Sequence, residues 1–385
     1  MRTTRVCHII TGLSTGGAEM MLYKLLSKTD RTSFDPEVIS LSGVGPIGKM
    51  IEELGVRVRG LGMQRGLGDV RSFLKFVHWL RRCNPHLVQT WMYHSDFIGG
   101  LGARLAGIPV IWGIHHENLD TRDNKFSTIW IAKTCARLSR VVPTAIICSS
   151  KTAARVHTAM GYTEEKMLVI PNGFDLSVFR FDPLVRTVVR KELGIPPDAP
   201  TVGMIGRFHP LKDHRTFVRA ASELNRYAPN VHYLLCGEGV TSQNELLTSW
   251  IRDAGLSANF HLLGRRDDMP SLYSAMDIAS SSSRGESFPN VVGEAMACGM
   301  PCVVTDVGDS AFIVGDSGRV VPPGDPRALA RAWSELIAAG PDERARLGEA
   351  ARRRVMGMFE ISSVVQQYEN TYRRVLDGVQ REARA

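Results

Sequence analysis

Two glutamates stand eight positions apart in the sequence, Glu286 and Glu294, with a Ser-Phe-Pro loop after the first. Pro289 suits a first helical position because it lacks an N–H and its φ is fixed, and Gly299 suits the left-handed residue that follows a helix end. We therefore expect one short helix over residues 289–298. Carboxylates only accept hydrogen bonds, so both glutamates are suited to binding ligand hydroxyl groups.

The predicted start of this helix is a candidate phosphate site. N–H groups near Asn290 and Val291 lack partners within the helix, and the helix dipole is positive at this end. Phe288 precedes them in the same loop. A nucleotide-sugar diphosphate bound here would meet Glu286 on its sugar side and Glu294 on its ribose side.

A second candidate for phosphate binding follows the predicted strand at residues 202–205. Gly206 and Arg207 come directly after it, and Lys212 follows in the same loop. A guanidinium grips phosphate oxygens with its planar fork, and an ammonium adds a point charge. Isolated basic residues in a loop are usually solvated and bind nothing. This loop, however, follows a strand that should neighbour the Glu286 loop, and that position favours phosphate binding.

Alternating apolar runs and amphipathic stretches predict two parallel α/β sheets. Predicted strands of the first sheet are residues 6–10, 37–41, 87–90, 110–114 and 145–148, and those of the second are residues 202–205, 231–235, 260–263, 278–281 and 302–305. A chain of 385 residues suits two domains with a cleft between them. We expect domains at residues 1–171 and 172–361, joined at the turn-rich segment 170–175, with a C-terminal helix over residues 362–385 packing back on the first domain.

Ligands of open parallel sheets bind beyond the carboxyl ends of the strands. In the first domain, Gly16 and Gly17 follow the first strand and allow close backbone approach, although a simple turn explains a glycine pair equally well. His94 and His115 follow two further strands. A lone histidine is more often structural, but histidines at two strand ends favour a functional role.

Composition excludes several classes of protein. Hydrophobic content of 44% and charged content of 22% are those of an ordinary globular chain, and the formal charge of +8 favours anionic partners such as phosphates or a membrane surface. Seven scattered cysteines fit a reducing cytoplasm, and Cys298 and Cys302 are expected to pack in the core rather than bind metal. The longest apolar runs fall short of a membrane span, so any membrane contact should be peripheral.

Together these motifs resemble glycosyltransferase family 4, a group of retaining, nucleotide-sugar-dependent enzymes with the GT-B fold. The most specific motif is the segment at residues 286–301, which looks like the paired-glutamate signature of the family followed by its Glu-Ala-Met-Ala-x-Gly-x-Pro run. Supporting motifs lie in the same order along the chain: Gly16-Gly17-Ala18-Glu19, residues 170–175, Gly206-Arg207, Gly237-Glu238-Gly239 and residues 260–264, which end at Gly264. The resemblance covers nearly the whole chain and implies the GT-B fold, two Rossmann-like domains facing each other across a cleft.

The resemblance also implies roles for individual residues. Glu294 would hold the ribose of the donor, Glu286 would bind hydroxyls of the transferred sugar, and Arg207 and Lys212 would neutralise the diphosphate as it departs. His115 matches a histidine that contacts the transferred sugar in the family, and His116 is the weaker candidate.

The Gly16–Gly17 loop would close over the donor. Ser287 stands where many relatives have glycine, which leaves the sugar preference open.

The implied chemistry needs no cofactor. The acceptor hydroxyl would attack the front face of the sugar, and the departing phosphate would take its proton. The sequence has no Asp-x-Asp motif to hold a metal ion on a diphosphate, so Arg207, Lys212 and the helix start are expected to serve instead. Metal independence is therefore expected.

The sequence says less about the acceptor than about the donor. The amphipathic segment at residues 70–82 mixes Phe73, Phe76 and Leu80 with several basic residues, as interfacial helices do, and an ordinary surface helix looks similar. If this segment touches membrane, the acceptor is a lipid-linked saccharide; otherwise it is another saccharide. Family analogy suggests extension of a bacterial surface polysaccharide, in the cytoplasm or peripherally on the inner face of the cell membrane.

Two other functions compete with this interpretation. A nucleotide-sugar epimerase of the same fold would bind the same donor without an acceptor, but the Glu-Ala-Met-Ala run and the Gly16–Gly17 loop argue against it. An inactive adaptor for membrane, nucleic acid or another polyanion should show decayed motifs and dominant basic-aromatic clusters. Glu286, Glu294, Arg207, Lys212 and His115 are all present, which disfavours the inactive adaptor, and nucleic acid is not expected as a partner.

Overall fold

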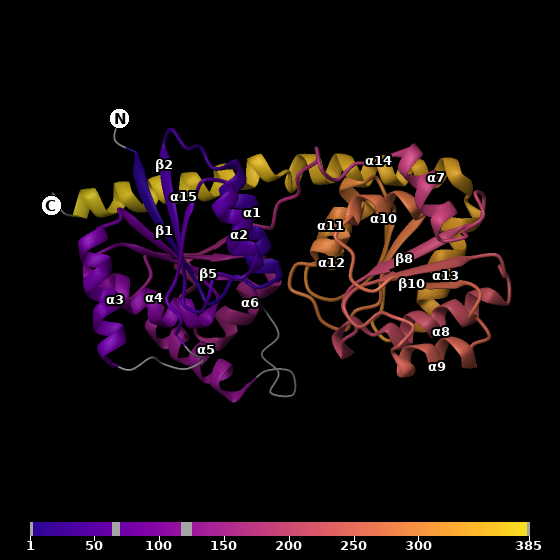
Figure 1. Ribbon diagram of the computed structural model, residues 1–385, viewed down its shortest axis with the longest axis horizontal. Coiled ribbons are helices and arrows are strands. Elements are labelled where there is room, and N and C mark those ends of the chain that lie inside the picture. Colours follow the sequence, from indigo (N-terminus) through magenta and orange to yellow (C-terminus); the bar gives the residue numbers. More distant parts are fainter. Residues whose placement is uncertain (1–2, 64–69, 117–124, 383–385) are drawn as a thin grey trace. The chain divides into compact units, whose positions relative to one another are not determined.

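The computed structural model of the protein describes residues 3–63, 70–116 and 125–382. The chain forms two compact units (Figure 1). Unit 1 consists of Met1–Gly173 and Ile361–Ala385, and unit 2 of Phe174–Glu360. The first division between them falls after Gly173, within the turn-rich segment at residues 170–175.

Unit 1 is built on a seven-stranded parallel sheet with the strand order β3-β2-β1-β4-β5-β6-β7. Its strands are β1 (Thr4–Ile10), β2 (Phe34–Ser40), β3 (Arg57–Gly60), β4 (Leu87–Trp91), β5 (Val110–Ile114), β6 (Ala145–Cys148) and β7 (Met167–Val169). Its helices are α1 (Gly17–Lys28), α2 (Pro46–Glu53), α3 (Val70–Cys83), α4 (Tyr93–Ala106), α5 (Phe126–Leu138), α6 (Lys151–Met160), the short 3-10 helix Glu164–Lys166 and α15 (Ile361–Glu382). Helices α1, α2 and α15 pack on one face of the sheet, and α3, α4, α5 and α6 on the other.

Unit 2 is built on a six-stranded parallel sheet with the strand order β10-β9-β8-β11-β12-β13. Its strands are β8 (Thr201–Ile205), β9 (His232–Cys236), β10 (Phe260–Leu262), β11 (Ile278–Ser281), β12 (Cys302–Thr305) and β13 (Arg319–Val321). Its helices are α7 (Pro183–Glu192), α8 (His214–Asn225), α9 (Glu245–Asp253), α10 (Met269–Ala275), α11 (Asn290–Ala297), α12 (Ser310–Val314), α13 (Pro326–Ala338) and α14 (Gly340–Met358), with the 3-10 helices Pro210–Lys212 and Gly315–Ser317. Helices α8, α9 and α13 cover one face of this sheet, and α7, α10, α11 and α12 the other.

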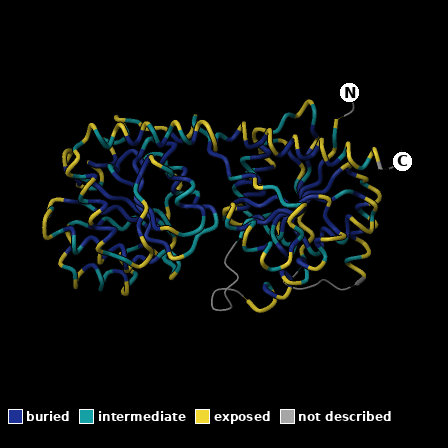
Figure 2. Tube along the Cα trace, turned by 180° about the vertical axis from the view of Figure 1, so that it is seen from behind, coloured by how far each residue is buried: buried dark blue, intermediate teal, exposed yellow. Residues whose placement is uncertain are grey.

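The two sheets confirm the predicted fold. All ten predicted strands are present, because each contains a short, largely apolar run that stands out in the sequence. Figure 2 shows burial along the strands, with exposed residues on the outer sides of the helices. Three strands were missed, β3, β7 and β13. Each is short, lies at a sheet edge and is partly exposed, so it has no continuous apolar run.

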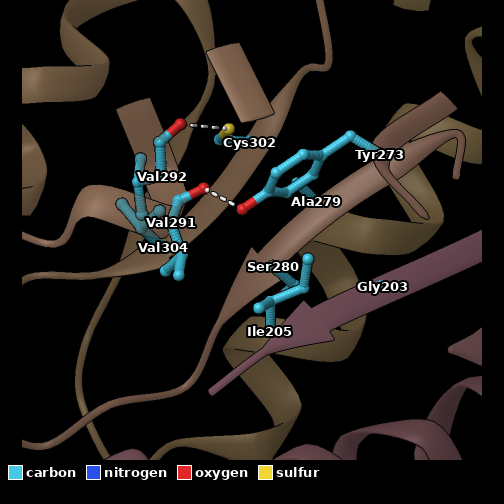
Figure 3. A pocket seen from close by; sticks show the side chains of 9 residues that line it. All are labelled: Gly203, Ile205, Tyr273, Ala279, Ser280, Val291, Val292, Cys302 and Val304. Atoms are coloured by element: carbon cyan, nitrogen blue, oxygen red, sulfur yellow. Dashed lines mark hydrogen bonds between the residues drawn. The ribbon is translucent and has the colours of Figure 1, made fainter. Parts of the chain in front are cut away.

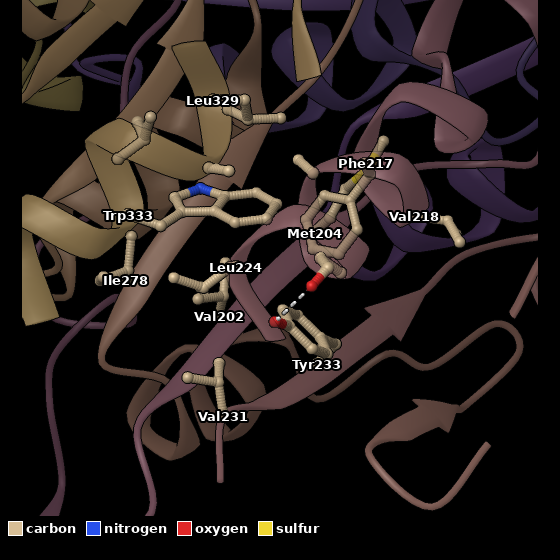
Figure 4. Close-up of a cluster of buried hydrophobic side chains, with 14 of the residues drawn as sticks. Val202, Met204, Phe217, Val218, Leu224, Val231, Tyr233, Ile278, Leu329 and Trp333 are labelled. Carbon is tan, nitrogen blue, oxygen red and sulfur yellow. Dashed lines mark hydrogen bonds between the residues drawn. The ribbon is translucent and has the colours of Figure 1, made fainter. Parts of the chain in front are cut away.

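Each unit has its own apolar core. In unit 2, the indole of Trp333 packs against Phe217 at a tilted angle, with their ring centroids 4.8 Å apart (Figure 4). Its Nε1 donates a 3.0 Å hydrogen bond to Ser280 Oγ. In the same cluster the Tyr233 hydroxyl donates to the carbonyl of Ala221. The aromatic residues thus reach the centre of the unit with their polar atoms paired.

The C-terminal helix α15 belongs to unit 1. Its apolar stripe, Val365, Tyr368, Tyr372 and Val375, is buried in one cluster with side chains of α1 and β4. The Tyr372 hydroxyl donates to Gln89 Oε1 of β4. Residues 383–385 of the predicted helix lie outside the described residues.

No helix in the described parts of the chain has the length and apolar character needed to cross a membrane. In α3, the candidate interfacial helix, Phe76, Val77 and Leu80 are buried in the core of unit 1. The Phe76 ring lies so close to Gly102 of α4 that a Cβ there would be 2.6 Å from it. The apolar face of α3 therefore packs on the protein, as in an ordinary surface helix.

Candidate functional site

The candidate site of unit 2 lies at the carboxyl ends of its two central strands. From β8 the chain proceeds to β9 and β10 on one side, and it later returns to place β11 and β12 on the other side. The gap between β8 and β11 is therefore the topological switch point of the sheet, where ligands of such folds bind. The loop at residues 206–212 follows β8, and the loop at residues 282–288 follows β11.

Lys212 and Glu286 meet across this switch point. Lys212 Nζ lies 2.5 Å from Glu286 Oε1, and Ser283 Oγ donates a 2.6 Å hydrogen bond to the same oxygen. The lysine side chain is 21% exposed and the glutamate side chain 11%. An ammonium and a carboxylate thus stand side by side, partly shielded from water, which strengthens their interaction with each other and with a ligand.

Further contacts hold the two loops together. The N–H of Arg284 donates to the carbonyl of Leu211 at 2.7 Å, and Ser282 Oγ donates to the carbonyl of Lys212 at 3.0 Å. Arg284 Nε donates to Asp213 Oδ2 at 2.6 Å. The Lys212–Glu286 pair is therefore positioned by backbone and side-chain contacts that do not depend on the pair itself.

Asp213 has a left-handed backbone, with φ at 48°. It caps helix α8, since its Oδ1 accepts a hydrogen bond from the N–H of Thr216. Left-handed non-glycine residues cost energy and cluster at functional sites. Here the unusual backbone turns the chain directly after Lys212.

Three predicted site glycines lie next to one another at the ends of β8, β9 and β10. The N–H of Gly206 donates to the carbonyl of Cys236, and that of Gly237 donates to the carbonyl of Gly264, each at 2.8 Å. A Cβ on Gly237, whose φ is +153°, would lie 2.1 Å from the carbonyl oxygen of Gly206. The absence of side chains at this edge leaves bare backbone that a ligand can approach closely.

Arg207 lies between Gly206 and the Lys212 loop, and its side chain is exposed. Its guanidinium makes no hydrogen bond or ion pair with any residue that the structure describes. The backbone next to Arg207 is fixed by a hydrogen bond, in which the N–H of Phe208 donates to the carbonyl of Glu238 at 2.7 Å. A fixed backbone with an uncommitted guanidinium is suited to gripping an incoming phosphate.

Helix α11 begins one residue later than predicted. Pro289 is its N-cap residue, with ψ at 94°, and Asn290 is the first helical residue. Gly299 has φ +74°, which confirms the predicted left-handed position after the helix. Gly293 packs directly against the Phe174 ring, where a Cβ would lie 2.1 Å from the nearest ring carbon, so helix α11 lies close to the start of unit 2.

Phe288 is not available as a side-chain contact for a ligand. Its ring is only 7% exposed, and it lies between Phe174 and Phe359 with centroid distances of 6.2 and 5.7 Å. The sequence predicted that Phe288 binds substrate. With its side chain buried, only the backbone of Phe288 is left for such a contact. Apolar packing explains why a phenylalanine stands here.

Glu294 lies on α11 and is half-buried. The Tyr273 hydroxyl is 3.0 Å from the carbonyl oxygen of Val291 and 3.2 Å from Glu294 Oε2. Figure 3 shows the contact with Val291. Burial, and then the charge of Glu294, raise the pKa of Tyr273 well above its usual value, so its hydroxyl stays protonated and can donate.

A small void lies below α11, lined by Tyr273, Val291 and seven other residues (Figure 3). Its volume of about 10 Å³ is close to the space that one water molecule needs. It is far too small for a sugar nucleotide and belongs to the packing under the helix.

The loop after β12 supports the Glu286 loop, a role that the sequence did not reveal. Gly308 has φ +56°, and a Cβ there would lie 1.7 Å from the carbonyl oxygen of Glu286. The N–H of Asp309 donates to the carbonyl of Ser287 at 3.0 Å. The available signal was the Asp306-Val307-Gly308-Asp309 run directly after a predicted strand.

Replacing Glu294 by alanine is expected to weaken donor binding by about 1–3 kcal/mol, because charged hydrogen bonds to the ribose are lost. Calorimetric titration with the donor nucleotide measures this. Glu349→Ala removes an exposed carboxylate of α14 and serves as the matched control. Equal donor affinities of Glu294→Ala and Glu349→Ala would show that Glu294 does not bind the donor.

In unit 1, Gly16 is the N-cap residue of α1 and Gly17 its first helical residue. They lie at the carboxyl end of β1, beside the switch point between β1 and β4. A Cβ on Gly16 would lie 2.3 Å from Glu19 Oε2, so the Glu19 side chain folds back over the glycine. A side chain at position 16 would displace the Glu19 carboxylate from this place.

His115 follows β5 and stacks on Trp91 of β4, with ring centroids 4.8 Å apart and an angle of 16° between the planes. Trp91 stacks in turn on Tyr368 of α15 and donates from Nε1 to His8 Nδ1 at 3.2 Å. Burial lowers the pKa of His115 to about 4. The imidazole is therefore neutral near pH 7, held in place by a stack that reaches the C-terminal helix.

Asp96 is a buried carboxyl group near the start of α4. Its Oδ1 accepts a 2.6 Å hydrogen bond from Thr90 Oγ1, and burial raises its pKa from 3.8 to about 8. The folded state thus keeps a proton that the unfolded state has lost between these pH values, so rising pH favours unfolding. We expect Asp96→Asn to gain stability relative to the wild type as pH rises from about 4 to 8.

Urea unfolding across this pH range measures the difference. Asp377→Asn, an exposed position on α15, is the control and should follow the wild type. A constant difference between Asp96→Asn and the wild type would contradict a protonated Asp96.

Among residues 3–63, 70–116 and 125–382, no group of three or more His, Cys, Asp or Glu side chains is arranged to hold a metal ion.

Comparison with known proteins gives matches in both units. Residues 15–178 match Glycosyltransferase Family 4, and residues 199–339 match Glycosyl transferases group 1. Over 255 residues the chain is 27% identical to the UDP-Gal:alpha-D-GlcNAc-diphosphoundecaprenol alpha-1,3-galactosyltransferase of Escherichia coli, and the match covers 64% of each protein, just under two thirds. Over 321 residues it is 27% identical to EpsF of Bacillus subtilis (strain 168), covering 78% of this chain and 79% of EpsF.

The crystal structure of Anabaena HepE in complex with UDP has the same fold. Its TM-score is 0.85 at 22% identity, and the match covers 96% of this chain and 99% of HepE. Family matches in both units and the GT-B architecture of this neighbour lead to one conclusion: the chain belongs to the group 1/family 4 glycosyltransferases.

Proposed function

We propose that the protein transfers a sugar from a nucleotide-diphosphate sugar to a hydroxyl group of a saccharide or lipid-linked saccharide, with retention of the anomeric configuration. The observation that carries this proposal is the Lys212–Glu286 pair at the switch point of unit 2, 2.5 Å apart. It combines a cation for the diphosphate with a carboxylate for sugar hydroxyls. The bare backbone at Gly206, Gly237 and Gly264 lies along the same edge of the sheet.

In this proposal the bond between the anomeric carbon and the phosphate oxygen breaks, and the nucleoside diphosphate leaves with the bonding electrons. Negative charge grows on the leaving group, and Lys212 and Arg207 stabilise it together with the N–H groups near Asn290 and Val291. The acceptor hydroxyl forms the new bond on the same face of the sugar, and its proton passes to the departing phosphate.

The remaining residues bind and orient the donor in the proposed reaction. Glu286 holds hydroxyls of the transferred sugar, and Glu294 holds the ribose. His115, as a neutral imidazole, exchanges hydrogen bonds with the transferred sugar, and the Gly16–Gly17 loop closes over the donor. These roles come from the family resemblance and the local geometry of each unit.

UDP-linked hexoses are the first donors to test. HepE binds UDP and UDP-glucose in its crystal structures, and the Escherichia coli relative is named as a UDP-galactose-dependent enzyme acting on a diphosphoundecaprenol-linked sugar. By the same analogy, the proposed acceptor is a lipid-linked saccharide of bacterial surface polysaccharide synthesis, reached from the inner face of the cell membrane.

A donor screen tests the proposal. The purified protein is heated with UDP- and GDP-linked glucose, galactose, N-acetylglucosamine and mannose, and slow hydrolysis of each donor is measured with and without EDTA. We expect one donor to raise the melting temperature and to be hydrolysed despite EDTA. Loss of hydrolysis in EDTA would overturn metal independence, and interconversion of donor sugars would point to an epimerase.

A further inference from the structure

Helix α5 of unit 1, labelled in Figure 1, carries an exposed stripe of two aromatic and two basic residues. Phe126, Trp130, Lys133 and Arg137 are spaced by four, three and four positions, which places them on one face of the helix. Phe126 is 81% exposed and Trp130 49%. Two large aromatic side chains on the surface of one helix are unusual, since such side chains normally contribute to a core.

The opposite face of α5 anchors the helix in unit 1. Ile131, Ala132, Cys135 and Ala136 are buried in the same cluster as strands β4, β5 and β6. The stripe therefore does not arise from a helix that has lost its packing partner. The inner face of α5 packs in the core of unit 1, and its outer face is exposed.

A basic hollow adjoins the end of the stripe. Lys133, Arg137 and Arg140 line it together with Ala136, Met160 and Gly161, and its volume is about 600 Å³. No acidic side chain is among these lining residues. The three cationic side chains form no ion pair with any residue in the described part of the chain.

The composition of this surface is typical of a membrane interface. Two aromatic side chains lie at one end of the stripe, and three cations follow them. Aromatic residues favour the boundary between headgroups and acyl chains, and long basic side chains extend to the lipid phosphates. Charge complementarity favours an anionic bilayer, because three cations with no acidic side chain among the lining residues match a surface of many phosphates.

We propose that this surface, formed by Phe126, Trp130, Lys133, Arg137 and Arg140, docks unit 1 on an anionic phospholipid bilayer. The basic hollow takes lipid phosphate groups, and the aromatic side chains enter the outer acyl region. Helix α3 cannot do this with its apolar face, because Phe76, Val77 and Leu80 are buried. The inference rests on the proposed function in one respect, the membrane-bound acceptor. None of these residues belongs to the donor site, so failure of vesicle binding and failure of sugar transfer are separate results.

Vesicle flotation tests the proposal with the full chain. Vesicles of phosphatidylcholine alone are compared with vesicles containing equal amounts of phosphatidylcholine and phosphatidylglycerol. We expect binding to the anionic vesicles and much weaker binding to the neutral ones. Each cation near an anionic bilayer contributes about fivefold in affinity, so the triple variant Lys133→Gln/Arg137→Gln/Arg140→Gln should bind about 100-fold more weakly.

A matched variant separates the effect of this surface on vesicle binding from the effect of net charge. Arg71→Gln/Lys75→Gln/Arg82→Gln removes the same charge from exposed positions of α3 in the same unit, and it should bind anionic vesicles nearly as the wild type does. The double variant Phe126→Ser/Trp130→Ser should lose affinity without losing charge. Donor-induced stabilisation of all three variants should equal that of the wild type, which shows that they fold.

Three outcomes would overturn the proposal. Equal loss of vesicle binding in the α5 and α3 triple variants would show an effect of net charge alone. Undiminished binding of the α5 variants would place the contact elsewhere. Release of the protein from anionic vesicles by a single-stranded oligonucleotide, with tighter binding to that oligonucleotide, would assign the surface to nucleic acid.

Discussion

Replacing Lys212 by alanine is expected to lower kcat by about 10²–10³-fold, because a cation aimed at the growing charge of the leaving diphosphate is lost. KM should change far less, since the missing interaction is stronger in the transition state than in the bound donor. Initial rates at varied donor concentration, with the acceptor or as donor hydrolysis, measure both constants.

The geometry of the pair makes this test specific. Ser283 Oγ still donates to Glu286 Oε1 in the variant, so the glutamate keeps one partner. Because the two side chains are only 21% and 11% exposed, loss of the lysine leaves a largely buried carboxylate, and the melting temperature should fall. The constants kcat and KM are therefore compared at a temperature at which the variant stays folded. Lys191→Ala, at an exposed position of α7, is the same substitution in the same unit and should leave kcat unchanged. A raised KM with an unchanged kcat would show that Lys212 only binds the donor.

Replacing Gly308 by alanine is expected to destabilise unit 2 by about 2–5 kcal/mol. A left-handed backbone costs an alanine about 1–2 kcal/mol, and forcing an extra carbon into a filled space costs about 1–3 kcal/mol more. The added Cβ would lie 1.7 Å from the carbonyl oxygen of Glu286. Because no atom can remain at that distance, the Glu286 loop must move, and donor binding should fall with it.

Gly324 provides the control for this substitution. Its φ of +73° is also left-handed, but a Cβ there would meet nothing within 4 Å. Gly324→Ala should therefore show the cost of the backbone alone, about 1–2 kcal/mol, with normal donor binding. Urea unfolding and donor titration of the two variants separate the effects. Equal costs and equal affinities would mean that the loop after β12 does not support Glu286.

Sequence periodicity and turn chemistry predicted most of the strands and helix α11 within about one residue, although β1 and β2 begin two and three residues earlier than predicted. Strand β5, for example, is apolar along its length because both faces of the sheet are covered. Strand β3, Arg57–Gly60, was missed because an edge strand with exposed residues has no such signal. The predicted helix start was off by one, since Pro289 suits both the N-cap and the next position.

The sequence by itself determined which chemical groups are present and at which strand ends they occur: the paired glutamates, Arg207, Lys212 and the glycines. The local sequence pattern predicts the strands but determines their order in the sheet only in part. The sequence therefore could not show which loops lie next to each other. The tertiary structure brought Lys212 onto Glu286, buried the Phe288 ring, and placed Gly308 against the Glu286 carbonyl. It also stacked Tyr368 behind Trp91 and His115. These contacts join residues far apart in the chain, and packing of whole helices and strands, which no local propensity encodes, is what selects them.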